Sequence, residues 1–151
     1  MINADNLTDL RLDPIGLPPY AGRNISQTLE PIDNAAQLAR TVNGTLIDLA
    51  DGTYRKYKST ISCTDQQSPA LDGVWPGMIL TVDCIVELSY LTAGGSPERP
   101  IASTTDDPAT RTEGAYTFYR PRLTMMVVGY RKSRVEWEGD SAWSLDLEEV
   151  A

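Results

Sequence analysis

The sequence MILTVDCIVELSY, residues 78–90, decides the fold because its apolar residues recur at every second position. This period is that of a β-strand with one buried face. Polar residues occupy most of the alternate positions, although Ile79 and Ile85 make part of the second face apolar too. A strand of this length exceeds the usual five or six residues. We therefore expect a second sheet or a neighbouring subunit to cover it.

Four further segments have the patterns of strands or hairpins. They are residues 39–48, 55–64, 116–130 and 143–148. In the first, Asn43-Gly44 is the pair best suited to the positive φ angles of a two-residue type I′ turn. In the third, Pro121 is expected to bend the strand or to lie at a sheet edge. With about seven strands and no long helix, the chain is expected to be mainly β, an antiparallel β-sandwich or a squat barrel.

Two segments without a sustained apolar period stand apart from these strands. Residues 1–36 form an expected extended N-terminal arm, because prolines deny it a long helix, with room for a short helical turn at 34–38. Residues 37–151 form a single β domain that contains a long loop at 92–114. Because polar, proline-rich segments have too little apolar surface to offset their ordering entropy, we expect contacts with neighbouring subunits to hold the arm and the loop. Trp75 is expected to cap a sheet edge or one end of the core.

Composition argues against several classes of protein. The formal net charge is −8, from 13 Lys and Arg against 21 Asp and Glu, so a sequence-reading DNA or RNA binder is not expected. We expect no membrane span, since no apolar run approaches roughly eighteen residues, and we expect synthesis in the cytoplasm, since the first residues lack a signal-peptide pattern. Cys63 and Cys84 fall on the apolar phase of two predicted strands. We favour buried free thiols, with a disulfide left open if those strands are neighbours.

Residues that support catalysis or bind metal are scarce. The chain has no histidine, which removes Ser-His-Asp and Cys-His catalysis and His-ligated zinc. Carboxylate pairs at 106–107 and 148–149 could serve a glycosidase, but a solvated acidic surface is the favoured interpretation. Asp5, Asp9 and Asp13 lack the glycine and final glutamate of a calcium loop. We therefore expect a protein that is not an enzyme, with no catalytic residue, no metal and no cofactor.

Prolines and arginines of the arm and the loops are the candidate contact residues. Basic side chains on an acidic protein favour the acidic patches of a neighbouring copy over a nucleic-acid backbone. The candidates are Pro14, Pro18, Pro19, Tyr20, Pro31, Pro97, Arg99, Pro100, Arg111, Arg120 and Arg122.

Several short motifs resemble those of a known group of proteins. They are ARTVNGTL at 39–46, RKY at 55–57, TISC at 60–63, PALDGVWPG at 69–77 and YRPRLT at 119–124. Over roughly residues 38–90 and 115–148 the chain is similar to small β-rich tail and tail-tip proteins of long-tailed bacteriophages. The resemblance implies small β domains that form rings, with arms and loops that clasp neighbours, and it transfers no functional residues.

These observations together predict a non-enzymatic virion structural protein of a tailed bacteriophage, forming part of the tail tip or baseplate ring. Its expected partners are other copies of itself and neighbouring tail or baseplate proteins, with DNA passing an acidic lumen without specific binding. Its expected location is the virion tail, after synthesis in the host cytoplasm. Two alternatives stay open: a capsid decoration or head–tail connector protein, and a host-surface glycan-binding module that uses Tyr and Trp side chains.

Overall fold

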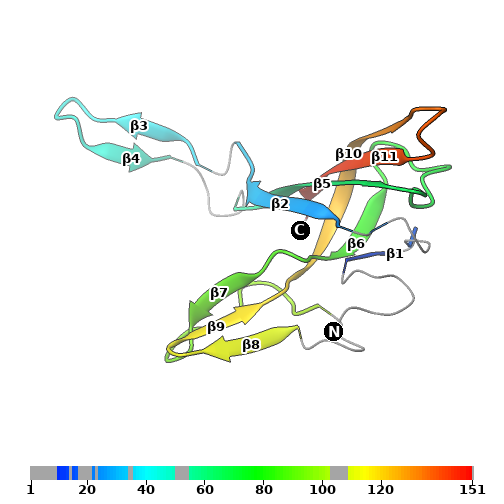
Figure 1. Ribbon diagram of the computed structural model, residues 1–151. Helices are drawn as coiled ribbons and strands as arrows, with labels where there is room; N and C mark the ends of the chain where they lie inside the picture. The colour runs from blue at the N-terminus through cyan, green and yellow to red at the C-terminus, as the bar shows by residue number, and fades with distance from the viewer. Residues whose placement is uncertain are drawn as a thin grey trace.

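The computed structural model describes residues 10–13, 15–16, 22, 24–33, 36–49, 55–102 and 109–150. Within these ranges the chain forms eleven β-strands and no helix, which confirms the predicted mainly β class (Figure 1). The strands are β1 (Arg11–Asp13), β2 (Ser26–Pro31), β3 (Leu38–Arg40), β4 (Leu46–Asp48), β5 (Tyr57–Asp65), β6 (Ile79–Asp83), β7 (Leu88–Leu91), β8 (Thr110–Glu113), β9 (Tyr116–Tyr119), β10 (Arg122–Arg134) and β11 (Ser141–Glu149).

The core lies on one face of a six-stranded antiparallel sheet with the order β1-β6-β10-β11-β5-β2. Alternation in the sequence predicts this face correctly, since Ile61 and Cys63 of β5 and Trp143, Leu145 and Leu147 of β11 are all buried. The sheet is open, because β1 and β2 at its edges do not pair with each other. The described strands therefore form no closed barrel, and the finer expectation of a sandwich or squat barrel is not confirmed.

Parts of the predicted N-terminal arm belong to this sheet. Its described strands β1 and β2 occupy the two edges, where β1 pairs with β6 and β2 with β5. Leu10 and Leu12 are buried in the core. A proline-containing segment fits an edge, because the outer side of an edge strand has no ladder partner to lose.

Residues 78–90 form two strands in two different sheets, where the sequence predicts one. β6 pairs with β10 in the main sheet, whereas β7 pairs with β9 in a three-stranded sheet of order β7-β9-β8. At the break, Cys84–Glu87 lie opposite Arg120 and Pro121, and the Cys84 N–H donates to the Pro121 carbonyl at 3.0 Å. Because Pro121 has no N–H and the segment 84–87 is longer than the segment 120–121 opposite it, the ladder bends there. The bend lets one ribbon cross from the main sheet to the small sheet (Figure 1).

The predicted long loop is shorter than expected, because its last part is strand β8, which pairs with β9. Trp75 is 70 % exposed and does not cap the core of the described chain, in which Leu71 and Val74 of the same connection are buried. The two cysteines are free and buried, as favoured from the sequence.

Residues 39–48 contain the predicted hairpin, with a different turn. β3 pairs with β4, and Leu38 begins β3 where the sequence leaves room for a helical turn. The Thr41 N–H donates to the Thr45 carbonyl at 2.9 Å, and the Gly44 N–H donates to the Thr41 carbonyl at 2.9 Å. Gly44 has a φ of 84°, whereas Asn43 does not have a positive φ. The connection is therefore a three-residue loop with glycine in the left-handed position, and the two-residue type I′ turn is wrong.

Candidate functional site

The predicted contact residues of the N-terminal region are placed only in part. Pro14, Pro18, Pro19 and Tyr20 lie outside the described residues. Pro31 ends the edge strand β2 and is exposed. Because no described strand pairs with the outer side of β2, the sheet itself accounts for a proline at this position.

Arg99 of the long loop is held inside the molecule by a buried carboxylate. Its Nε donates to Glu149 Oε1 at 2.8 Å, and its Nη2 donates to the Arg55 carbonyl at 3.0 Å. The Glu149 side chain is 1 % exposed, and its second oxygen accepts the Tyr57 N–H at 3.3 Å. The guanidinium also lies 5.3 Å from the centre of the Tyr57 ring. Arg99 therefore fastens the loop to the ends of β5 and β11.

Three more candidate residues meet at the bend between the sheets. The Arg122 N–H donates to the Pro100 carbonyl at 2.7 Å, and the Ala102 N–H donates to the Arg120 carbonyl at 2.9 Å. The Arg122 guanidinium donates twice to Asp83, at 2.7 and 3.1 Å. This charge-assisted pairing raises the pKa of Arg122 above its ordinary value. The loop thus runs along the bend and covers it.

Arg111 lies on the small sheet and bridges two carboxylates. It donates to Glu87 at 3.0 Å and to Glu113 at 2.7 Å, and its guanidinium lies 4.2 Å from the centre of the Phe118 ring. Pro97, the last of the candidates, is half-buried in the loop. The structure thus brings Pro100, Arg120 and Arg122 together at the bend, whereas Arg99 and Arg111 make separate contacts within the same chain.

The β3–β4 hairpin carries apolar side chains that the rest of the described chain does not cover. β3 and β4 contact each other and no other described strand, and the hairpin points away from both larger sheets (Figure 1). Leu38 and Leu46 lie on one face and Ile47 and Leu49 on the other, with exposed fractions from 38 % to 64 %. Val42 is exposed in the turn. The hairpin therefore offers apolar surface on both faces.

A second uncovered apolar group lies on the outer face of the main sheet. Ile79 of β6 is directly opposite Met126 of β10, and both side chains are exposed. Val128 follows at a bulge, where the register with β11 shifts between Val127 and Gly129. Val128 faces outward in the same alternation as Met126, and the bulge changes the phase of the residues after it, so that Arg131 and not Tyr130 shares the outer face.

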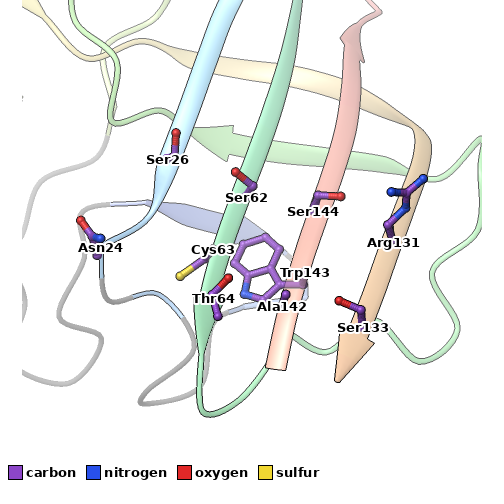
Figure 2. A pocket seen from close by; sticks show the side chains of 10 residues that line it. All are labelled: Asn24, Ser26, Ser62, Cys63, Thr64, Arg131, Ser133, Ala142, Trp143 and Ser144. Atoms are coloured by element: carbon purple, nitrogen blue, oxygen red, sulfur yellow. The ribbon is translucent and has the colours of Figure 1, made fainter. Parts of the chain in front are cut away.

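A hollow of about 430 Å³ crosses four strands of the main sheet, farther along its outer face. Ser26 of β2 is opposite Ser62 of β5, Ser62 is opposite Ser144 of β11, and Ser144 is opposite Arg131 of β10. Figure 2 shows these four side chains as one row across the strands. A single cross-strand row thus presents three hydroxyls and one guanidinium.

The next row of the same hollow is also polar. Thr64 is opposite Ala142, and Ala142 is opposite Ser133. Asn24 lies beyond Thr64 and has a φ of 59°, the sole positive value at a non-glycine position in the described part of the chain. Asparagine tolerates this left-handed conformation better than most residues.

The hollow and its neighbour contain no carboxylate. A second hollow of about 340 Å³ shares Ser133 and includes Lys132 and Arg134, and neither hollow is lined by Asp or Glu. The side chains of Arg131, Lys132 and Arg134 make no ion pair or hydrogen bond with another described residue. Arg131 is therefore the cation of the hollow on the outer face and has no anionic partner in the described ranges, whereas Lys132 and Arg134 are opposite Trp143 and Ser141 and lie on the alternate phase of β10.

The structure offers little for nucleophilic or metal chemistry. Burial raises the pKa of the Cys84 thiol to about 12, and the charges of Asp83 and Glu149 add to the rise. Such a thiol stays protonated and unreactive at neutral pH. In the described ranges, no group of three or more His, Cys, Asp or Glu is placed to hold a metal ion.

Sequence patterns do not reveal the serine row or the uncovered hairpin. Each serine lies on the outward phase of its own strand, which is typical of a solvated face, and the row exists only once four strands are in register. The hairpin is visible in the sequence, but its lack of cover is a property of the packed chain.

Comparisons with protein-family models, with curated proteins and with solved structures find no match. Among the residues that the structure describes, no helix is long and apolar enough to cross a membrane.

Proposed function

We propose that this protein is a non-enzymatic structural protein of a tailed-bacteriophage virion, which forms part of the tail tip or baseplate ring. It associates with further copies of itself and with neighbouring tail or baseplate proteins. The observation that carries the proposal is the β3–β4 hairpin, because its apolar residues have no cover within the described chain.

A two-stranded hairpin is marginally stable in water, and its stability depends on a surface to pack against. Here both faces carry large apolar side chains, Leu38 and Leu46 on one and Ile47 and Leu49 on the other. Burying such a side chain contributes roughly 1.5–3 kcal/mol. A neighbouring molecule that covers both faces would stabilise the hairpin and would gain binding free energy.

The apolar group of Ile79, Met126 and Val128 supports association between identical chains. The hairpin and this group are different surfaces of one molecule. When one surface of a protomer binds a different surface of the next, the contact repeats and closes into a ring if the rotation allows. This arrangement fits a ring component of a tail.

The test is the oligomeric state of the full chain at high micromolar concentration, measured by size-exclusion chromatography with light scattering. We expect the wild-type protein to form a closed oligomer and Leu46→Asp to shift the mass to that of the protomer. Leu46→Val is the matched control, because it keeps an apolar side chain at the same strand position, and it should retain the oligomer. A wild-type protein that remains a monomer would contradict the proposal.

Imaging of particles labelled on this protein tests the location. Label at one end of the tail supports the tail-tip or baseplate ring. Label at capsid lattice points or at the head–tail junction would contradict it in favour of a decoration or connector protein.

A further inference from the structure

We propose that the hollow across β2, β5, β11 and β10 binds a sugar that bears an oxyanion, either a carboxylate or a phosphate. This site is separate from the hairpin and the apolar group that support self-association. It also differs from a glycan site built from Tyr and Trp side chains, since the polar groups that would contact the sugar here are hydroxyls and one guanidinium (Figure 2).

The hydroxyl row matches the chemistry of a sugar. Ser26, Ser62 and Ser144 each carry a group that both donates and accepts, as sugar hydroxyls do. Neighbouring strands lie about 4.8 Å apart, so a row that spans two such steps extends about 10 Å, which is room for one or two sugar rings. Thr64 and the Asn24 amide add polar groups along the second row.

The cation at the end of the row selects for an acid. Arg131 is opposite Ser144, and its planar guanidinium suits a carboxylate or phosphate bound through two hydrogen bonds. A chain of net charge −8 repels anions over most of its surface, so a hollow that is lined by Arg131 and by no carboxylate is where an anion is held.

The backbone of the rim supports a fixed site. Asn24 holds a left-handed conformation where the chain approaches β2, and such conformations persist when the surroundings hold them. The strands that present Ser62, Ser144 and Arg131 belong to the longest ladders of the sheet. A site on paired strands is already formed before the ligand binds, which lowers the entropic cost of binding.

The experiment measures binding of defined sugars to the full-length protein by ligand-observed saturation-transfer NMR, with dissociation constants from calorimetry. The probes are glucuronate, glucose 6-phosphate and glucose, with acetate and inorganic phosphate as sugar-free anions. We expect one or both acidic sugars to bind saturably, with a dissociation constant on the order of 1 mM for a shallow site. Glucose and the sugar-free anions should bind at least tenfold more weakly. Which acidic sugar binds more tightly identifies the oxyanion.

Variants locate the binding to the hollow. Arg131→Gln should weaken binding of the acidic sugar at least tenfold, and Ser144→Val should weaken it severalfold by removing the hydroxyl next to Arg131. Arg55→Gln is the matched control, because it removes one exposed arginine charge outside the hollow and should leave the dissociation constant unchanged. Circular dichroism and the unfolding midpoint check that each variant is folded.

Several results would overturn the proposal. Absence of saturable binding by both acidic sugars would do so, as would acetate or phosphate binding as tightly as the sugars, which would indicate a simple anion patch. Equal losses in Arg131→Gln and Arg55→Gln would indicate non-specific attraction. A change of oligomeric mass in Arg131→Gln, with sugar binding unaffected, would show that the hollow is instead a contact between copies.

Discussion

The Arg99–Glu149 pair gives the sharpest prediction for stability, because it joins a loop to two strands through one buried charge. In Arg99→Met the methionine keeps most of the apolar stem of the side chain and removes the guanidinium. Glu149, whose side chain is 1 % exposed, is then left as a buried carboxylate without its cation. Breaking a buried pair in this way costs about 3–5 kcal/mol. Because Arg99 itself is 18 % exposed, we expect a loss near the lower end, about 3 kcal/mol.

A second variant separates the cost of leaving the Glu149 charge buried and unpaired from the cost of losing the contacts of Arg99. Glu149→Gln in the Arg99→Met background removes the buried charge and keeps an oxygen that can accept the Tyr57 N–H. We therefore expect the double variant to be more stable than Arg99→Met by about 2 kcal/mol, although still less stable than the wild type.

Equilibrium unfolding in urea, followed by the fluorescence of the buried Trp143, measures both variants. The free energies are compared at equal m-values, so that a change in the unfolded state is not mistaken for a change in the pair. The reasoning fails if Arg99→Met costs less than about 1 kcal/mol, or if Glu149→Gln destabilises the Arg99→Met protein further.

Two other predictions concern the thiol in the core and a glycine in the long loop. The pKa of Cys84 rises from 9.0 to about 12 on folding, so above pH 9 the unfolded state releases the thiol proton while the native state keeps it, and stability falls as pH rises. Between pH 8 and 10.5 the wild type should lose about 2 kcal/mol more than Cys84→Val in urea unfolding, and parallel pH profiles would contradict this. Gly95→Ala should cost about 2 kcal/mol, because its Cβ would clash with the backbone carbonyl of Leu91. Gly129→Ala, which meets nothing within 4 Å, should change thermal stability by less than about 0.5 kcal/mol, and equal losses at both glycines would refute the steric argument.

Strand phase is the part of the fold that the sequence predicts well. Trp143, Leu145 and Leu147 are buried as their alternation indicates, and so are Ile61 and Cys63. The reason is local: successive side chains of a strand point to opposite faces whatever its partners are.

Errors arise where a distant segment decides the local structure. The alternation of residues 78–90 continues through Cys84, yet the strand breaks there. The reason is that the segment opposite residues 84–87 contains Pro121 and is shorter. The Asn43-Gly44 turn is a smaller case of the same kind, since the register of β3 with β4 makes Asn43-Gly44 part of a three-residue loop. In both cases the sequence of the segment does not show which residues of the partner strand lie opposite it.

The proposed sugar-binding site could not be predicted from the sequence. Arg99, Arg111 and Arg122 are predicted as contact residues from charge alone, and the structure pairs each of them with a carboxylate of the same chain. Arg131 is not among the predicted contact residues, although it lies beside the serine row without a partner among the described residues. Charge in a sequence gives no indication of which cations are neutralised within the chain.

By itself the sequence determined the β class, the buried phase of β5 and β11 and the lack of histidine-based chemistry, because these depend on residue type and on the twofold period of a strand. Only the tertiary structure decided which segments pair, where the ribbon bends, which arginines are neutralised and which apolar side chains stay uncovered. These depend on contacts between residues far apart in the chain, and a hydrogen-bond ladder fixes them only when both strands are in place.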